Sequence, residues 1–189
     1  MRARYREVSF TLLAPVVVLA APAPSFAVDY LTAEQAQAES FPGAERFEVR
    51  EVELSPEALA AVASRLGAPF PRSRWTLRLA WRGGELLGAL VVDDVVGKFE
   101  RITYSVGLGL DGTIRQVEIL SYRESHGQEV RLPLWRKQFV GKSAASPLRI
   151  GQDIAGISGA TLSCAHVVEG IRRITNAFPE LLHAGGVTP

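Results

Sequence analysis

The 189-residue chain has few of the side chains that build metal or thiol chemistry. It contains one cysteine, Cys164, and three histidines. A single cysteine excludes an internal disulfide, a zinc site of the cysteine type and the thiol pair that attaches c-type haem. The sequence Asp93-Asp94 lacks ligand spacing relative to the histidines, so we predict no metal site. We expect these two acids to lie in a turn or at a sheet edge.

Neither sign of charge is in clear excess. The chain has 21 Lys and Arg against 20 Asp and Glu, for a formal net charge of +1. Proteins that bind nucleic acid show a basic patch or stripe. Since this chain has no basic block, we expect no nucleic-acid partner.

Motifs for nucleophilic or nucleotide chemistry are also missing. There is no P-loop, and no G-x-G-x-x-G stands between a strand and a helix. The stretch Ser158-Gly159-Ala160-Thr161 is not G-x-S-x-G, and no strand leads directly into it. His126, His166 and His183 form no recognisable triad pattern. We therefore assign no catalytic residue.

No apolar run reaches the roughly 20 residues that span a bilayer. The longest, from Phe10 to Ala21, contains Pro15 and follows three arginines within the first six residues. Ser25-Phe26-Ala27 then supplies a small-x-small cleavage signal. This order predicts a signal peptide over residues 1–27. We expect an exported, periplasmic or extracytoplasmic domain over residues 28–189, anchored to a membrane if the leader is retained.

The mature chain reads as one α+β domain, with its core at about residues 72–178. Thr32 and Ser55 are placed to cap two short helices, and Gly67 to end the second. Between residues 72 and 122, apolar and polar residues alternate in strands joined by Gly-Gly and Asp-Gly turns. Consecutive strands with short turns predict a largely antiparallel sheet with flanking helices. A C-terminal helix follows, beginning near Thr161 or Leu162.

A long irregular segment precedes that helix, and long loops within compact domains are often functional. It ends in Ser158-Gly159-Ala160-Thr161. Gly159 permits close approach of the backbone to a ligand. The start of the helix offers unpaired N–H groups and a positive dipole end, which attract phosphate. The alternative is that Ser158 or Thr161 simply caps the helix.

Two motifs together indicate a family. The stretch "ISGATLS", leading into a C-terminal helix, resembles the signature of the FMN-binding domain family. "YRESHGQEV" followed by "LWRKQFVGK" is similar to that family's E-[ST]-x-G segment and the Trp/Phe helix after it. The family includes exported FMN-binding proteins and the peripheral flavin subunits of the Rnf and sodium-pumping NADH:quinone reductase complexes.

The resemblance implies that Thr161 carries FMN through a phosphoester bond, which a separate flavin transferase makes outside the cytoplasm. Ser158, Gly159 and Ala160 would form the loop against the phosphate and ribityl chain. The residues that the resemblance places near the isoalloxazine ring or its supporting loop are Glu124, Ser125, His126, Gly127, Trp135 and Phe139. Core packing explains Trp135 and Phe139 equally well, and loop exposure explains His126.

One position departs from the family pattern. The family usually has aspartate six residues before the modified threonine, and this chain has Ala155 there. If the flavin transferase or the flavin site requires that carboxylate, modification slows or fails. Alternatively, Gly156 lets the loop bulge so that Asp153 reaches the same place.

The function that this resemblance implies is that of an exported electron carrier, with FMN passing electrons between a membrane reductase and an acceptor. Its partners would be the flavin transferase and membrane or exported redox proteins. Two alternatives stay open. One is an exported flavin-dependent reductase of a small substrate, and the other is a cofactor-free assembly or binding module that has lost flavinylation.

Overall fold

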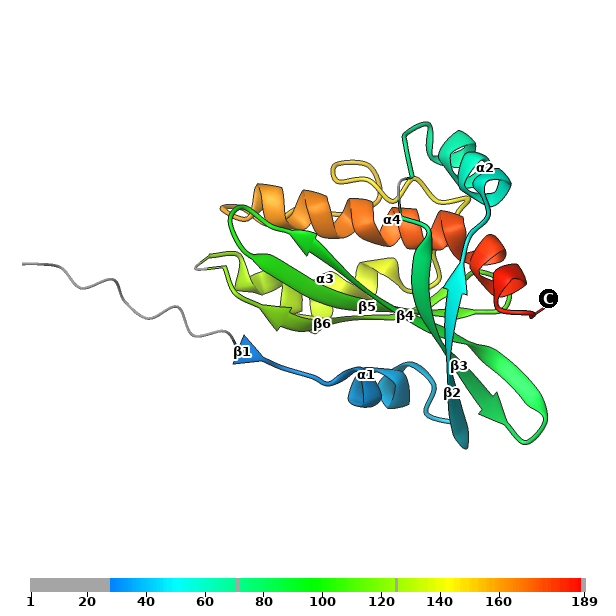
Figure 1. Cartoon of the computed structure of the whole chain (residues 1–189). Coiled ribbons are helices and arrows are strands. Elements are labelled where there is room, and N and C mark those ends of the chain that lie inside the picture. Colours follow the sequence, from blue (N-terminus) through cyan, green and yellow to red (C-terminus); the bar gives the residue numbers. More distant parts are fainter. Residues whose placement is uncertain (1–27, 71, 125, 188–189) are drawn as a thin grey trace, which may run out of the picture.

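The computed structural model describes residues 28–70, 72–124 and 126–187 (Figure 1). The leader predicted over residues 1–27 and the predicted site residue Ser125 lie outside the described residues. One antiparallel sheet of six strands has the order β1-β6-β5-β4-β3-β2, which confirms the predicted α+β class. The strands are β1 (Val28–Asp29), β2 (Arg46–Glu53), β3 (Arg74–Arg82), β4 (Glu85–Val96), β5 (Arg101–Gly109) and β6 (Ile114–Tyr122).

Helices cover both faces of the sheet (Figure 1). One face carries α2 (Pro56–Leu66) and α4 (Thr161–Ala184), and the other carries α1 (Ala33–Ser40). A short helical segment lies against β6 and consists of η1 (Gln128–Arg131), α3 (Pro133–Arg136) and η2 (Lys137–Phe139). In the part of the chain that the structure describes, no helix is long and apolar enough to span a bilayer.

The predicted caps of the first two helices are confirmed. The Thr32 hydroxyl accepts the N–H of Gln35, whose side chain accepts the N–H of Thr32, so the pair forms a capping box. The Ser55 hydroxyl caps α2 at the N–H of Ala58, and Gly67 ends it in the left-handed conformation, with φ of 66°. Local sequence signals therefore set the boundaries of both helices.

The main core lies between the sheet and α4. Thirteen of the 24 residues of α4 are buried, including Cys164, which fills the core as a small apolar residue. Gly170 marks a close approach of α4 to the sheet, because a Cβ atom there would lie 2.0 Å from the Tyr104 hydroxyl oxygen on β5. The missing side chain lets helix and sheet pack closely at this point.

Asp93 and Asp94 correct one sequence prediction. They lie within β4, an inner strand, and neither is in a turn or on an edge strand. Asp93 is buried, pairs with Arg72 and accepts the Tyr104 hydroxyl at 3.0 Å. Burial, and then the charge of Asp93, raise the pKa of Tyr104 well above its ordinary value, so this hydroxyl remains a donor. The alternation of apolar and polar residues in the sequence cannot predict a buried carboxylate whose charge is balanced by an arginine 21 residues away.

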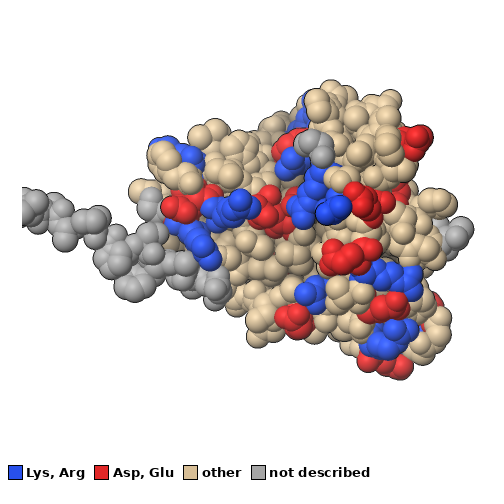
Figure 2. All heavy atoms as spheres, viewed as in Figure 1, with Lys and Arg blue, Asp and Glu red and all other residues tan. Residues whose placement is uncertain are grey.

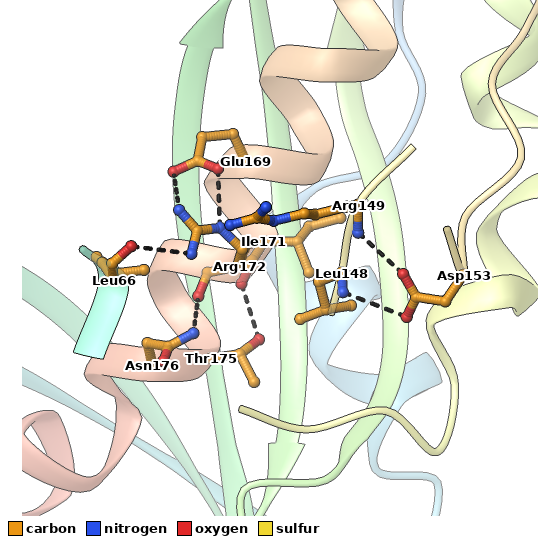
Figure 3. A network of polar contacts seen from close by, with 9 residues as sticks. All are labelled: Leu66, Leu148, Arg149, Asp153, Glu169, Ile171, Arg172, Thr175 and Asn176. Carbon is orange, nitrogen blue, oxygen red and sulfur yellow. Dashed lines mark hydrogen bonds and ion pairs between the residues drawn. The ribbon is translucent and has the colours of Figure 1, made fainter. Parts of the chain in front are cut away.

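The loop before α4 is held by Asp153 (Figure 3). Its carboxylate accepts the N–H groups of Leu148 at 3.2 Å and Arg149 at 2.9 Å, and it pairs with Lys142 at 3.0 Å. Leu148 is buried and has φ of 46°, a region that non-glycine residues rarely adopt. Asp153 thus stabilises an unfavourable backbone conformation at the point where the loop enters the core.

Charges of both signs alternate over the face that carries β2 and β3 (Figure 2). Most belong to short ion pairs, among them Arg50 with Glu48 at 2.6 Å and Arg78 with Glu34 at 3.0 Å. Exposed pairs of this kind contribute about 0.2–1 kcal/mol each. This face shows no large region of a single sign.

Replacing Gly170 with alanine tests the close packing of α4 on the sheet. Helix propensity alone would stabilise the variant by about 1 kcal/mol. The overlap with Tyr104 should outweigh this gain and leave Gly170→Ala less stable by about 1–3 kcal/mol in denaturant unfolding. The control is Gly84→Ala, since a Cβ there meets no atom within 4 Å. A stabilised Gly170→Ala variant would show that α4 lies farther from the sheet.

Replacing Asp153 with asparagine tests the loop anchor. Burial alone would raise the pKa of Asp153, but the Arg149 amide, the Lys142 ammonium and the Leu148 amide outweigh it and lower the pKa. Its stabilisation is therefore complete above the unfolded pKa of about 3.9 and is lost as pH falls through the lower folded pKa. At pH 7 we expect Asp153→Asn to be less stable by about 1–2 kcal/mol. This difference from wild type should vanish in acid.

Unfolding curves of both proteins between pH 7 and pH 2 measure this effect. Glu39→Gln, on the exposed side of α1, is the control and should follow the wild-type curve. A constant offset between Asp153→Asn and wild type over the whole pH range would contradict the role of the charge.

Candidate functional site

A cavity of about 380 Å³ lies where three segments meet at one end of the sheet. They are the turn at residues 97–100 between β4 and β5, the loop after β6, and the start of α4. The volume falls within the range of roughly 300–1,000 Å³ that is usual for small-molecule and cofactor pockets. The lining residues are Lys98, Phe99, Glu124, His126, Gly159, Ala160, Thr161, Leu162 and Ser163.

The start of α4 faces this cavity without a cap. Ala160 occupies the N-cap position, and in the described residues no side chain caps the helix. The first turn contains no acidic residue. The predicted alternative, in which Ser158 or Thr161 serves as the cap, is therefore not observed. The N–H groups and the positive dipole end of a 24-residue helix remain available to an anion.

Thr161 is the first residue of α4, and it is exposed where it lines the cavity. Gly159, two residues earlier, has φ of 82°, which favours glycine. The left-handed turn at Gly159 brings the chain into the helix so that the Thr161 hydroxyl is accessible. Ala160, between them, is buried and anchors the turn.

Gly127 brings the two motif segments together. A Cβ atom at this position would lie 2.4 Å from the Ala160 Cβ and 2.7 Å from the Tyr122 hydroxyl oxygen. The residue also has φ of 84°, so a side chain there would be strained as well as crowded. The Tyr122 hydroxyl donates to the His126 carbonyl and supports the same loop. The loop after β6 can therefore lie directly against the loop that precedes α4.

A second hollow of about 290 Å³ adjoins the first. The two share His126 and Gly159, so the Ser158–Thr161 segment lies between them. The second hollow is lined by His126, Gly127, Gln128, Glu129, Ser158 and Gly159. The predicted residues Ser158 and Gly127 thus border the second hollow, and Glu124, Ala160 and Thr161 border the first.

Trp135 and Phe139 line neither hollow. Both are buried and pack edge to face, with ring centroids 5.1 Å apart. The Trp135 indole N–H donates to the Ala155 carbonyl at 2.8 Å, and the Gln138 side-chain oxygen accepts the Ala155 N–H at 2.7 Å. These residues therefore support the loop from the core side and fix its backbone at Ala155.

Asp153 also lies away from the cavity lining. Its two oxygens are engaged by Leu148, Arg149 and Lys142 as described above, within its own loop. The carboxylate thus accepts hydrogen bonds from backbone N–H groups four and five residues before it. The side chain of Ala155, by contrast, is exposed.

Four residues of the cavity were not predicted from the sequence: Lys98, Phe99, Leu162 and Ser163. Lys98 and Phe99 come from a turn some 60 residues before Thr161, and turn composition alone does not report a ligand site. Together the cavity offers an exposed hydroxyl, an uncapped helix start, one ammonium group and two large apolar side chains. This combination suits a ligand with an anionic end and a flat apolar end.

Comparisons with known proteins agree with that chemistry. Residues 97–176 match the family model described as FMN-binding domain. Among solved structures, the chain is similar to one subunit of the Na⁺-translocating NADH-quinone reductase from Parabacteroides distasonis. The identity is 16%, the TM-score is 0.50, and the match covers 80% of this chain and 84% of the other. No curated protein matches the chain.

At that identity the structural match establishes the fold. The family match covers all three segments that form the cavity, from the turn at Gly97 to Thr161 and the helix beyond it. Residues 97–176 of the chain therefore match the FMN-binding domain family.

Proposed function

We propose that this protein is an exported flavoprotein electron carrier that holds FMN covalently through a phosphoester to Thr161. The observation that carries the proposal is the exposed Thr161 hydroxyl at the uncapped start of α4, inside a cavity of the FMN-binding segment. Export is supported by the signal-peptide pattern over residues 1–27.

The residues of the cavity fit FMN. The uncapped N–H groups of α4 suit a phosphate, and the Lys98 ammonium adds positive charge in the same cavity. Gly159 leaves open space beside the backbone, because a Cβ there would meet no atom within 4 Å. Phe99 and Leu162 supply apolar surface for a flat ring system. Ser158, Gly159 and Ala160 would border the phosphate and ribityl chain.

Bound FMN would supply the redox chemistry, since it accepts and releases electrons. The protein's contribution is position, electrostatics and control of water. Thr161 would fix one end of the cofactor, and α4 would stabilise the negative charge there. An electron carrier of this kind needs no general base for the redox step, because the cofactor supplies that chemistry.

The exposure of Thr161 suits modification by a separate enzyme. An FAD-dependent flavin transferase would move the FMN part of FAD to the hydroxyl oxygen and release AMP, and the exposed Thr161 lets the enzyme reach that hydroxyl. The redox partners would be membrane or exported proteins, in keeping with the similar fold of a subunit of an NADH-quinone reductase.

A flavin-dependent reductase of a small exported substrate is the second candidate. The hollow of about 290 Å³ beside the cavity favours it, because it shares His126 and Gly159 with the proposed flavin site. Turnover of a small oxidant by the purified flavoprotein, and its loss when that hollow is filled by Gln128→Trp, would favour this candidate over the carrier.

Replacing Thr161 with alanine should abolish covalent flavin. The protein is co-expressed with a flavin transferase, precipitated in acid and tested for pellet fluorescence and for an intact mass raised by FMN less one water. Thr161→Ala should lose both signals completely because the only proposed acceptor hydroxyl is gone. Ser158→Ala, in the same loop, should keep them. Covalent flavin in Thr161→Ala would place the attachment elsewhere.

Replacing Ala155 with aspartate should raise the rate of flavinylation. The Ala155 side chain is exposed and its backbone is fixed, so the stability should change by less than about 0.5 kcal/mol. The fraction of modified protein is followed against time with limiting transferase. Ala145→Asp, at another exposed position of the loop, controls for added charge. Equal rates for wild type and Ala155→Asp would show that this carboxylate is dispensable.

A further inference from the structure

We propose that Glu124 is a positioning residue that fixes the turn at residues 97–100. This turn, called the wall below, forms one side of the flavin cavity, and its Phe99 ring shields the flavin from water. The inference rests on the proposed function, because it assigns the wall to a bound flavin. The sequence resemblance placed Glu124 near the ring or its supporting loop. The contacts of the Glu124 carboxylate favour the second role, because the carboxylate binds backbone N–H groups of the turn.

The Glu124 carboxylate binds the backbone of the turn. Its Oε1 atom accepts the N–H of Phe99 at 2.6 Å and the N–H of Glu100 at 3.0 Å. Bonds from N–H groups to a carboxylate are charge-assisted and stronger than bonds between neutral groups. Glu124 itself is 7% exposed, whereas Lys98, Phe99 and Glu100 are all exposed. A buried side chain thus holds an exposed turn in place.

Gly97 shows how closely the turn is fitted to Glu124. A Cβ atom on Gly97 would lie 2.5 Å from Glu124 Oε1 and 3.0 Å from the Ser163 hydroxyl oxygen of α4. Its N–H also donates to the Glu100 carbonyl at 2.8 Å and closes the turn. The turn, the loop after β6 and the first turn of α4 therefore meet at one point.

His166 holds the turn from the other side. Its Nδ1 lies 2.6 Å from the Val96 carbonyl oxygen and 3.2 Å from that of Gly97. Because both partners are carbonyls, Nδ1 carries the hydrogen and donates. The backbone of the turn is thus bound to α4 through His166 and to the loop after β6 through Glu124.

This fixed backbone carries a large exposed ring. Phe99 is 73% exposed and lines the cavity that Thr161 also lines, and the Lys98 ammonium lies 4.9 Å from the ring centroid. The exposed ring lines the cavity, while its backbone N–H is one of the two that Glu124 binds. A flat aromatic cofactor in the cavity would bury part of this apolar surface and be screened from solvent. In this wall, Phe99 would contact the cofactor, and Glu124 fixes the position of the backbone that carries Phe99.

Three variants test the inference: Glu124→Ala, Glu124→Gln and Phe99→Ala. Hydrogen exchange of the Phe99 and Glu100 amides, measured by NMR on flavin-free protein, reports how strongly Glu124 protects the backbone of the turn. Glu124→Ala should speed exchange at these two amides about ten- to a hundredfold, and Glu124→Gln, which keeps an acceptor oxygen, should restore most of the protection. Phe99→Ala should leave the Glu100 amide protected.

Quenching of flavin fluorescence by iodide at constant ionic strength, measured on the flavinylated proteins, reports the shielding. The quenching constant should rise about two- to fivefold in Glu124→Ala and in Phe99→Ala as the ring leaves or is removed. Glu124→Gln should stay near wild type. Leu134→Ala, which removes an apolar side chain that is 83% exposed and outside the cavity, is the control and should match wild type.

The possible results test the role of Glu124, the role of Phe99 and the proposed function separately. Unchanged exchange in Glu124→Ala would overturn the positioning role, with or without flavin. Unchanged quenching in Phe99→Ala, in a protein that does carry flavin, would overturn the shielding role of Phe99, while the proposed function stands. If Glu124→Ala fails to fold, Phe99→Ala still tests the wall. A wild-type protein that never acquires flavin would instead refute the proposed function, and the wall with it.

Discussion

The packing of α4 against the sheet is the contact on which the rest of the molecule depends. Its apolar face forms one side of the main core, and Gly170 allows it to approach Tyr104 closely. A helix of 24 residues is about 36 Å long, so it extends along the sheet and begins at one end of it. The same contact that builds the core therefore also determines where the helix begins, and the cavity lies at that beginning.

Several separate contacts then shape the cavity around the start of α4. Gly127 lets the loop after β6 lie against Ala160, and His166 and Glu124 bind the turn at residues 97–100. Trp135 fixes the loop at Ala155 from the core side. None of these residues needs to touch a ligand in order to matter for binding. The site is held by the packing of its surroundings, and Thr161 is left exposed within it.

Local parts of the fold could be predicted because their causes lie close together in the sequence. The capping box at Thr32 and the left-handed end at Gly67 each involve residues within one helical turn. The segments with Glu124 and Thr161 could be connected through the family resemblance. Lys98 and Phe99 could not, because only the pairing of β4 with β5 and the packing of α4 bring their turn to the cavity. Asp93 was misplaced because its partner Arg72 lies 21 residues away.

The charged residues along β2 affect how readily the edge of the sheet could pair with a strand of another chain. This strand forms one edge of the sheet, and an uncovered edge can accept a strand from another chain. Here the edge carries Arg46, Glu48, Arg50, Glu51 and Glu53, so an incoming strand would have to desolvate several charges at once. The opposite edge strand is β1, which has only two residues and pairs with Ser121 and Tyr122 of β6. The charges of β2 and the shortness of β1 are features that oppose edge-to-edge aggregation of an antiparallel sheet.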